Sequence, residues 1–219
     1  MLKLSTAEKI IFSFLLFVAA LLLMRIMYAH NLRYIFLLWN LFLAWIPFQL
    51  SISINNHYSK WVKYFLLVCW LLFFPNALYL ITDLIHLENQ GDRVPVWFDV
   101  ILLFTSSITG LLMAFISLYQ VELFLRKSIL QGHVNKLIAA SLFLGSFGVY
   151  IGRFLRWNSW DILANPVSLL IEIAVRFTNP FLHYRTWIVT MILTCLFCLL
   201  YFAAKKLPRL FAEERNGNS

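Results

Sequence analysis

The stretch FFPNALYLITDLIHLENQGD, residues 73–92, begins as an apolar segment and ends as a charged loop. Within it, Asn76, Tyr79, Asp83 and His86 follow one another at intervals of three, four and three residues. On an α-helix these intervals place side chains on one face. Polar and charged side chains that face lipid are costly. The pattern therefore predicts a membrane-embedded helix whose polar stripe faces the interior of a helical bundle.

The composition of the whole chain also indicates a membrane protein. Of its 219 residues 62% are hydrophobic and only 13% are charged, and a water-soluble domain of this size has too little interior to hide so much apolar surface. A helix needs about 20 apolar residues to cross the hydrocarbon. Six stretches meet this length, at residues 10–28, 34–54, 61–84, 96–119, 137–154 and 187–204. Helices are expected because backbone groups in lipid need partners within their own segment.

A further short helix is predicted before the last span. Asn165 and Pro166 suit an N-cap and a first helical position, and the helix would end near residue 177, which is too short to cross. Glu172 and Arg176 form an i, i+4 pair on it. We therefore predict an all-α, polytopic membrane helix bundle with six transmembrane helices plus one short interfacial or re-entrant helix. Residues 1–204 would form a single bundle domain and residues 205–219 a short polar cytoplasmic tail.

The distribution of charge predicts the orientation. With six spans both termini share one face, which carries eleven of the eighteen Lys and Arg residues and four of the ten acidic residues. The opposite face carries seven arginines, no lysine and six acidic residues. Because Lys and Arg mark the cytoplasmic side, both termini are expected in the cytoplasm. The basic excess is then explained by anionic lipid headgroups, and nucleic acid is not an expected partner.

The outer ends of the third and fourth spans carry the residues most suited to chemistry. Asp99 follows the loop that begins after His86, so Asp83, His86 and Asp99 are expected to converge. They are the candidate catalytic residues, as a general acid/base set or as ligands of a divalent metal, with His183 as a further metal candidate. The alternative is a helix mouth whose charges are paired and hydrogen-bonded for stability alone.

Other polar residues are expected to complete this site or to lie apart from it. Asn76 and Tyr79 are candidate ligand-binding residues, and Pro75 would free a backbone carbonyl one turn earlier to pair with the Asn76 amide. Asn40 is expected in the cytoplasmic half of the second span.

A second candidate cluster lies at the outer end of the fifth span. Arg153 and Arg156 are close enough on a helix for both guanidinium groups to reach a common region. Two guanidinium groups so close together need an anionic partner, either an acidic residue of the chain or a phosphate or carboxylate ligand. The candidate ligand-binding residues of this cluster are Arg153, Arg156, Asn158, Asp161 and Glu172.

Several of these blocks resemble a known family. FFPNALYLITDLIHL (73–87), WFDV (97–100) and YIGRFLRWNSWD (150–161), followed by Asn165-Pro166, are similar to the signature blocks of a bacterial integral-membrane family, domain of unknown function thirteen-sixty-one. The resemblance extends from about the second span to the sixth. It implies a multi-pass protein of the bacterial plasma membrane and carries no established activity or ligand.

Three functions are compatible with this sequence. The best hypothesis is a membrane-embedded enzyme or binder that acts on an anionic, lipid-type or phosphate-bearing ligand at the outer leaflet. A small-solute or ion transporter would use the same site as an outer vestibule, but inverted repeats and paired broken helices, which would favour it, are not evident. A structural or interaction protein would use the polar cluster only to set helix register.

Overall fold

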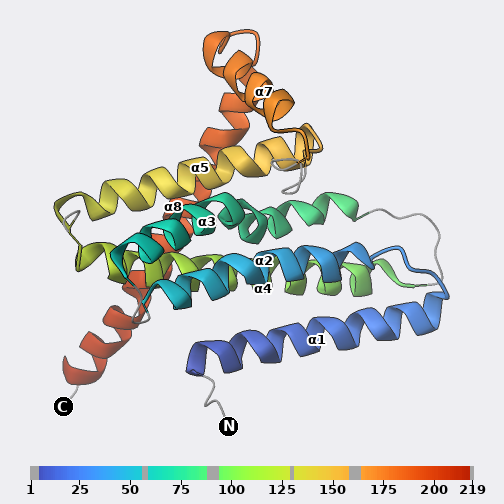
Figure 1. Cartoon of the computed structure of the whole chain (residues 1–219). Helices are drawn as coiled ribbons and strands as arrows, with labels where there is room; N and C mark the ends of the chain where they lie inside the picture. The colour runs from blue at the N-terminus through green and yellow to red at the C-terminus, as the bar shows by residue number, and fades with distance from the viewer. Residues whose placement is uncertain (1–4, 56–58, 88–93, 129–130, 158–163, 218–219) are drawn as a thin grey trace. The chain divides into compact units, whose positions relative to one another are not determined.

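The chain forms α-helices and short 3-10 helices, as shown in a computed structural model of residues 1–219 (Figure 1). The structure describes residues 5–55, 59–87, 94–128, 131–157 and 164–217. Within these ranges there is no strand, and six helices are long and apolar enough to cross a membrane. The predicted all-α polytopic bundle is confirmed. The chain divides into two compact units, Met1–Val134 and Asn135–Ser219.

Unit 1 contains four long helices, α1 (Thr6–Ala29), α2 (Phe36–Ile54), α3 (Lys60–Tyr79) and α4 (Val96–Arg126). A 3-10 helix, η1 (Leu80–His86), continues α3 without a break. Helix α4 packs against α1, α2, α3 and η1 and is therefore the central helix of this unit (Figure 1). Helix α1 begins where it does because Ser5 and Glu8 form a capping box.

Small and hydroxyl-bearing residues allow α4 to take this central place. Its buried positions include Ser106, Ser107, Gly110, Ala114 and Ser117. Such residues let helix backbones approach closely, which is the main source of specific helix packing in lipid. The Trp70 indole of α3 donates a hydrogen bond to the Ser117 hydroxyl at 3.3 Å, adding a polar link between the two helices.

The junction between α3 and η1 is packed tightly against α4. A Cβ atom added to Gly110 would lie 2.8 Å from the Ala77 carbonyl oxygen and 2.8 Å from the Leu80 Cβ. The Ser107 hydroxyl lies 2.8 Å from the Leu80 carbonyl oxygen, to which it can donate. The expectation that residues 61–84 form one α-helix was wrong at its end, because the helix tightens to 3-10 geometry from Leu80 onward.

Unit 2 contains three helices, α5 (Val134–Phe154), α7 (Pro166–Thr178) and α8 (Tyr184–Gly217). Only the first residue of α5, Val134, is assigned to unit 1. A short 3-10 helix, η2 (Gln131–His133), precedes α5. Aromatic rings join the three helices: Phe147 of α5 contacts both Phe177 of α7 and Trp187 of α8. Figure 1 shows α7 at the N-terminal end of α8. The predicted short helix at 166–177 is confirmed, and helix α8 extends through the segment predicted as a polar tail.

Replacing Gly110 with alanine is predicted to lower the free energy of unfolding by about 1–3 kcal/mol, because the new methyl group overpacks the α3–η1 junction. Thermal or denaturant unfolding in detergent measures this effect. Gly132→Ala is the matched control, since a Cβ at Gly132 meets no atom within 4 Å. Equal stability of the two variants would contradict the close approach.

Candidate functional site

The main polar site of unit 1 is built around a buried ion pair between α1 and α4. The Arg25 Nε donates to Asp99 Oδ1 at 2.7 Å, and Nη2 donates to Asp99 Oδ2 at 3.2 Å. The Arg25 side chain is fully buried and that of Asp99 is 6% exposed. Two parallel hydrogen bonds between a guanidinium and a carboxylate form the strongest common geometry for such a pair. We call Arg25, Asn31, Tyr34 and Asp99 the Arg25 cluster.

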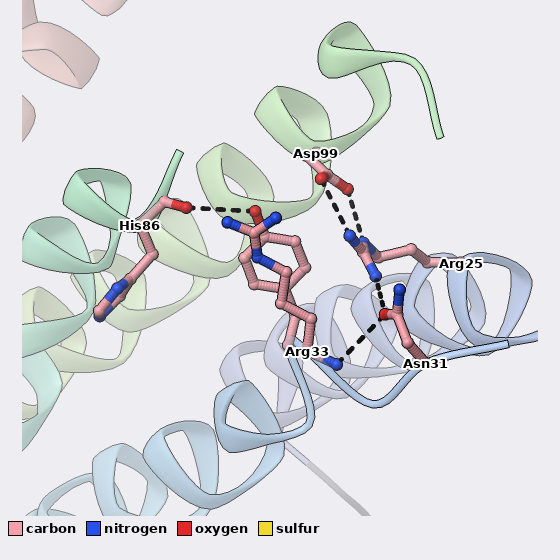
Figure 2. Close-up of polar contacts among 6 residues, drawn as sticks. Arg25, Asn31, Arg33, His86 and Asp99 are labelled. Carbon is pink, nitrogen blue, oxygen red and sulfur yellow. Dashed lines mark hydrogen bonds and ion pairs between the residues drawn. The ribbon is translucent and has the colours of Figure 1, made fainter. Parts of the chain in front are cut away.

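The loop between α1 and α2 completes the Arg25 cluster. The remaining Arg25 nitrogen, Nη1, donates to Asn31 Oδ1 at 2.7 Å (Figure 2). The Arg25 guanidinium carbon lies 4.4 Å from the centre of the Tyr34 ring, and that of Arg33 lies 5.5 Å from it, both within cation–π range. Every nitrogen of Arg25 therefore has a partner, as an intramembrane cation requires.

Tyr34 connects the Arg25 cluster to the end of η1. Its hydroxyl donates to the backbone carbonyl of His86 at 3.2 Å. Burial raises the pKa of the Tyr34 phenol, and the nearby Asp99 carboxylate raises it further, because both disfavour the phenolate. The hydroxyl therefore keeps its proton and remains a donor over the physiological range.

Asp83 lies in the same unit but has a different partner. It is fully buried on η1, and its Oδ2 accepts a hydrogen bond of 2.9 Å from the Asn40 amide of α2. Asn40 was expected in the cytoplasmic half of its span. That expectation was wrong, because Asn40 meets η1, whose C-terminal His86 is tied to the α1–α2 loop by Tyr34.

The other residues of the predicted stripe differ in burial: Asn76 and Tyr79 are half-buried, and His86 is exposed. Asn76 is half-buried, and its amide donates to the Phe73 carbonyl at 3.0 Å. Tyr79 is also half-buried, at the last residue of α3. His86 is exposed, and its imidazole packs edge-on against the Phe36 ring with centroids 5.1 Å apart. Figure 2 shows that the His86 imidazole points away from Asp99.

The donors around Asp99 decide whether the predicted metal site can form. In the described ranges no group of three His, Cys, Asp or Glu side chains is close enough to hold a metal ion. The Asp99 carboxylate faces the cation of Arg25, and a second cation on that side is unfavourable. The residues described around Asp99 therefore do not fit a divalent metal, and we assign no metal-dependent step to them.

The second predicted cluster belongs to unit 2. Arg153 is half-buried in the last turn of α5, whereas Arg156 is exposed just after it with φ of 60°. A left-handed backbone is unusual for arginine and costs about 1–2 kcal/mol.

Glu172 and Arg176 form the predicted ion pair on α7 at 2.8 Å. His183 lies half-buried between α7 and α8. Asn158 and Asp161 lie outside the described residues. Since Asp83, His86 and Asp99 belong to unit 1, a site shared by the two groups stays a prediction.

Sequence reasoning missed the partners that hold the acidic residues. Arg25, Asn31 and Tyr34 were not assigned to the site, although Arg25 is an isolated cation near the end of an apolar span. Its position was a usable signal, because intramembrane charges pair with one another. Asp99 lies 74 residues away in the chain, however, so no local spacing connects the two.

A pocket opens beside the Arg25 cluster. Its volume is about 330 Å³, within the lower range of small-molecule sites. Arg25 is the one charged side chain of its lining, which consists of Met24, Arg25, Tyr28, Val94, Pro95, Trp97 and Phe98. Met24, Tyr28 and Trp97 are about 60% exposed, at 59%, 61% and 62%. The pocket is thus lined by apolar side chains except at Arg25.

These features define a polytopic helical membrane protein with a polar cluster at one end of its first four helices. The chain belongs to the family described as Protein of unknown function (DUF1361), whose model matches residues 39–200. No curated protein and no solved structure matches the chain.

Removing one partner of the buried ion pair is predicted to destabilise the protein by about 3–5 kcal/mol, because the other charge is left buried and unpaired. Asp99→Asn and Arg25→Met should each show this loss in thermal unfolding, while the double variant should recover part of it. Lys127→Met, at an exposed position after the same helix α4, is the control for loss of one charge. Additive losses in the double variant would show that the two residues are not coupled.

Proposed function

We propose that the protein binds a lipid-type ligand whose apolar chain occupies the pocket beside the Arg25 cluster. The observation that carries this proposal is the lining of that pocket, which is apolar except for Arg25. The pocket lies between the end of α1 and the start of α4, both of which are candidate membrane spans. Its exposed Met24, Tyr28 and Trp97 would meet lipid, so a chain could enter sideways from the bilayer.

The ligand headgroup is proposed to lie at the membrane surface beside Arg25. Arg25 already donates to Asp99 and Asn31, so an anionic headgroup would approach an ion pair that is already formed. This arrangement suits recognition more than chemistry. Asp83 accepts a hydrogen bond from Asn40, and Asp99 accepts two from Arg25. The His86 imidazole points away from Asp99 (Figure 2), whereas a general acid/base pair acts on one proton within hydrogen-bond reach. We therefore favour the binder over the enzyme.

The binding proposal is tested with phosphatidylglycerol that carries a photoactivatable group in its acyl chain, reconstituted with the full chain. Crosslinks mapped by mass spectrometry are expected at residues 24–28 and 94–98. Met24→Trp should fill the pocket mouth and reduce this labelling about tenfold, a loss of roughly 1.4 kcal/mol in binding. Phe104→Trp, at an exposed position farther along α4, is the control.

Uniform labelling of all exposed apolar positions, unaffected by Met24→Trp, would refute the pocket as a binding site. A zwitterionic probe with the same acyl chains tests the headgroup. Equal labelling by both probes would be consistent with binding of the acyl chain, but it would exclude selection for the anionic headgroup.

The structural function remains the second candidate, and the Arg25–Asp99 ion pair favours it. A buried, bidentate pair between α1 and α4 sets their register whether or not a ligand binds. In this case Met24→Trp would leave lipid labelling unchanged, while the ion-pair variants would still lose stability.

We further propose that the protein resides in a bacterial plasma membrane with both termini in the cytoplasm. The Lys and Arg distribution supports this orientation. In a cysteine-free background, a membrane-impermeant maleimide should label Leu32→Cys in intact cells and should label Lys127→Cys only after lysis. Both positions are exposed. The reverse pattern would invert the topology and place the Arg25 cluster at the cytoplasmic surface.

A further inference from the structure

Among the described residues of unit 2, three buried polar groups have no hydrogen-bond partner within the protein. The Nε of Arg176, the indole Nε1 of Trp187 and the hydroxyl of Thr190 have no hydrogen-bond partner. Arg176 is 5% exposed and Thr190 is fully buried. Buried polar groups in proteins are nearly always hydrogen-bonded, and an unsatisfied one is costly. Three such groups in one small unit therefore require an explanation.

The three groups belong to two helices, α7 and α8, that contact each other through aromatic rings. Phe177, the residue after Arg176, packs edge-on against the Trp187 ring with centroids 4.9 Å apart. Thr190 lies three residues after Trp187 on α8, a spacing that places both on one helix face. We call Arg176, Trp187 and Thr190 the α7–α8 corner.

The position of the Arg176 side chain is set by its ion pair with Glu172. Nη2 lies 2.8 Å from the Glu172 carboxylate, and Nη1 donates to the Glu172 backbone carbonyl at 2.6 Å. These contacts use the outer nitrogens of the guanidinium and leave Nε without an acceptor. The Arg176 Nε and the Trp187 indole can only donate, whereas the Thr190 hydroxyl can donate or accept. An added acceptor group could therefore satisfy all three.

The outward face of α7 indicates where such an acceptor would come from. Val167, Leu170 and Ile171 are 67%, 63% and 57% exposed, whereas the cation of the same helix is buried. Apolar residues outside and a charge inside are opposite to the pattern of a helix in water and suit contact with lipid. With 13 residues, α7 is too short to cross the hydrocarbon. It is therefore suited to lie near the level of the lipid headgroups, whose phosphate oxygens are strong acceptors.

We propose that the α7–α8 corner binds the phosphate-bearing headgroup of a membrane lipid, with Arg176 Nε, Trp187 Nε1 and the Thr190 hydroxyl as the donors. Arginine and indole donors around a phosphate form charge-assisted hydrogen bonds, which are about twice as strong as neutral ones. This inference shares the lipid ligand class with the proposed function. It uses residues of unit 2 alone, so either proposal can fail while the other stands.

The experiment measures the thermal unfolding midpoint of the full chain in detergent as phosphatidylglycerol is added. It uses a Met24→Trp background, in which the pocket beside Arg25 is filled. The lipid is expected to raise the midpoint. Arg176→Lys keeps a cation for Glu172 but loses Nε, and Trp187→Phe keeps a packed ring but loses the N–H. Each should raise the lipid concentration for half of the shift about tenfold.

Two substitutions serve as matched controls: Arg185→Lys, at an exposed position on α8, and Trp61→Phe, in unit 1 at 85% exposure. Both should respond to the lipid as the Met24→Trp background does. Thr190→Val removes the hydroxyl with little change in side-chain size. It provides a second test if Trp187→Phe fails to fold. Diacylglycerol with the same acyl chains, and inorganic phosphate alone, test the source of the acceptor.

Little or no shift with diacylglycerol or inorganic phosphate, together with weakened responses of the α7–α8 corner variants, would support the proposal. An equal shift with diacylglycerol would overturn it, because the phosphate would then be unnecessary. An equal shift with inorganic phosphate would overturn the assignment to a lipid. Unchanged lipid responses in Arg176→Lys, Trp187→Phe and Thr190→Val would show that the three donors bind no lipid phosphate.

Discussion

The ion pair between Arg25 and Asp99 is the interaction on which the arrangement of unit 1 depends. Helices in lipid gain little from hydrophobic burial against one another, because lipid tails are as apolar as leucine side chains. Helix α1 is almost wholly apolar and packs on α4, so its apolar residues specify only weakly how it sits there. A charged pair in a low-dielectric environment is different, since each charge needs the other in one geometry. The two hydrogen bonds of Arg25 to Asp99 supply that specificity.

A second constraint acts where α3 becomes η1. Gly110 and Ser107 of α4 allow the backbone near Leu80 to come close and supply a hydroxyl for its carbonyl. The tighter 3-10 winding then carries Asp83 to Asn40 of α2. Small residues on one helix thereby determine where an acidic side chain on another helix is placed. The polar cluster follows from close backbone packing as much as from its own charges.

The two units offer different chemistry to a lipid. In unit 1 the polar groups satisfy one another, and the neighbouring pocket is apolar. In unit 2, at the α7–α8 corner, rings of α7 and α8 pack together, but the donors Arg176 Nε and Trp187 Nε1 are left without acceptors. The first arrangement suits an apolar chain and the second suits a phosphate. The proposed lipid binding would use both arrangements, and neither requires the catalytic role first predicted for Asp83, His86 and Asp99.

The sequence by itself determined the fold class, the six spans and the short helix with its Glu172–Arg176 pair. These features depend on apolar length, on helix periodicity and on the local pairing of residues four apart, all of which are written in neighbouring positions. It also located the third and fourth spans as carriers of the polar residues. Only the tertiary structure decided that Asp99 pairs with Arg25 and that Asp83 pairs with Asn40, because those partners lie 74 and 43 residues away. Their meeting depends on how helices pack, which no local spacing in the chain records.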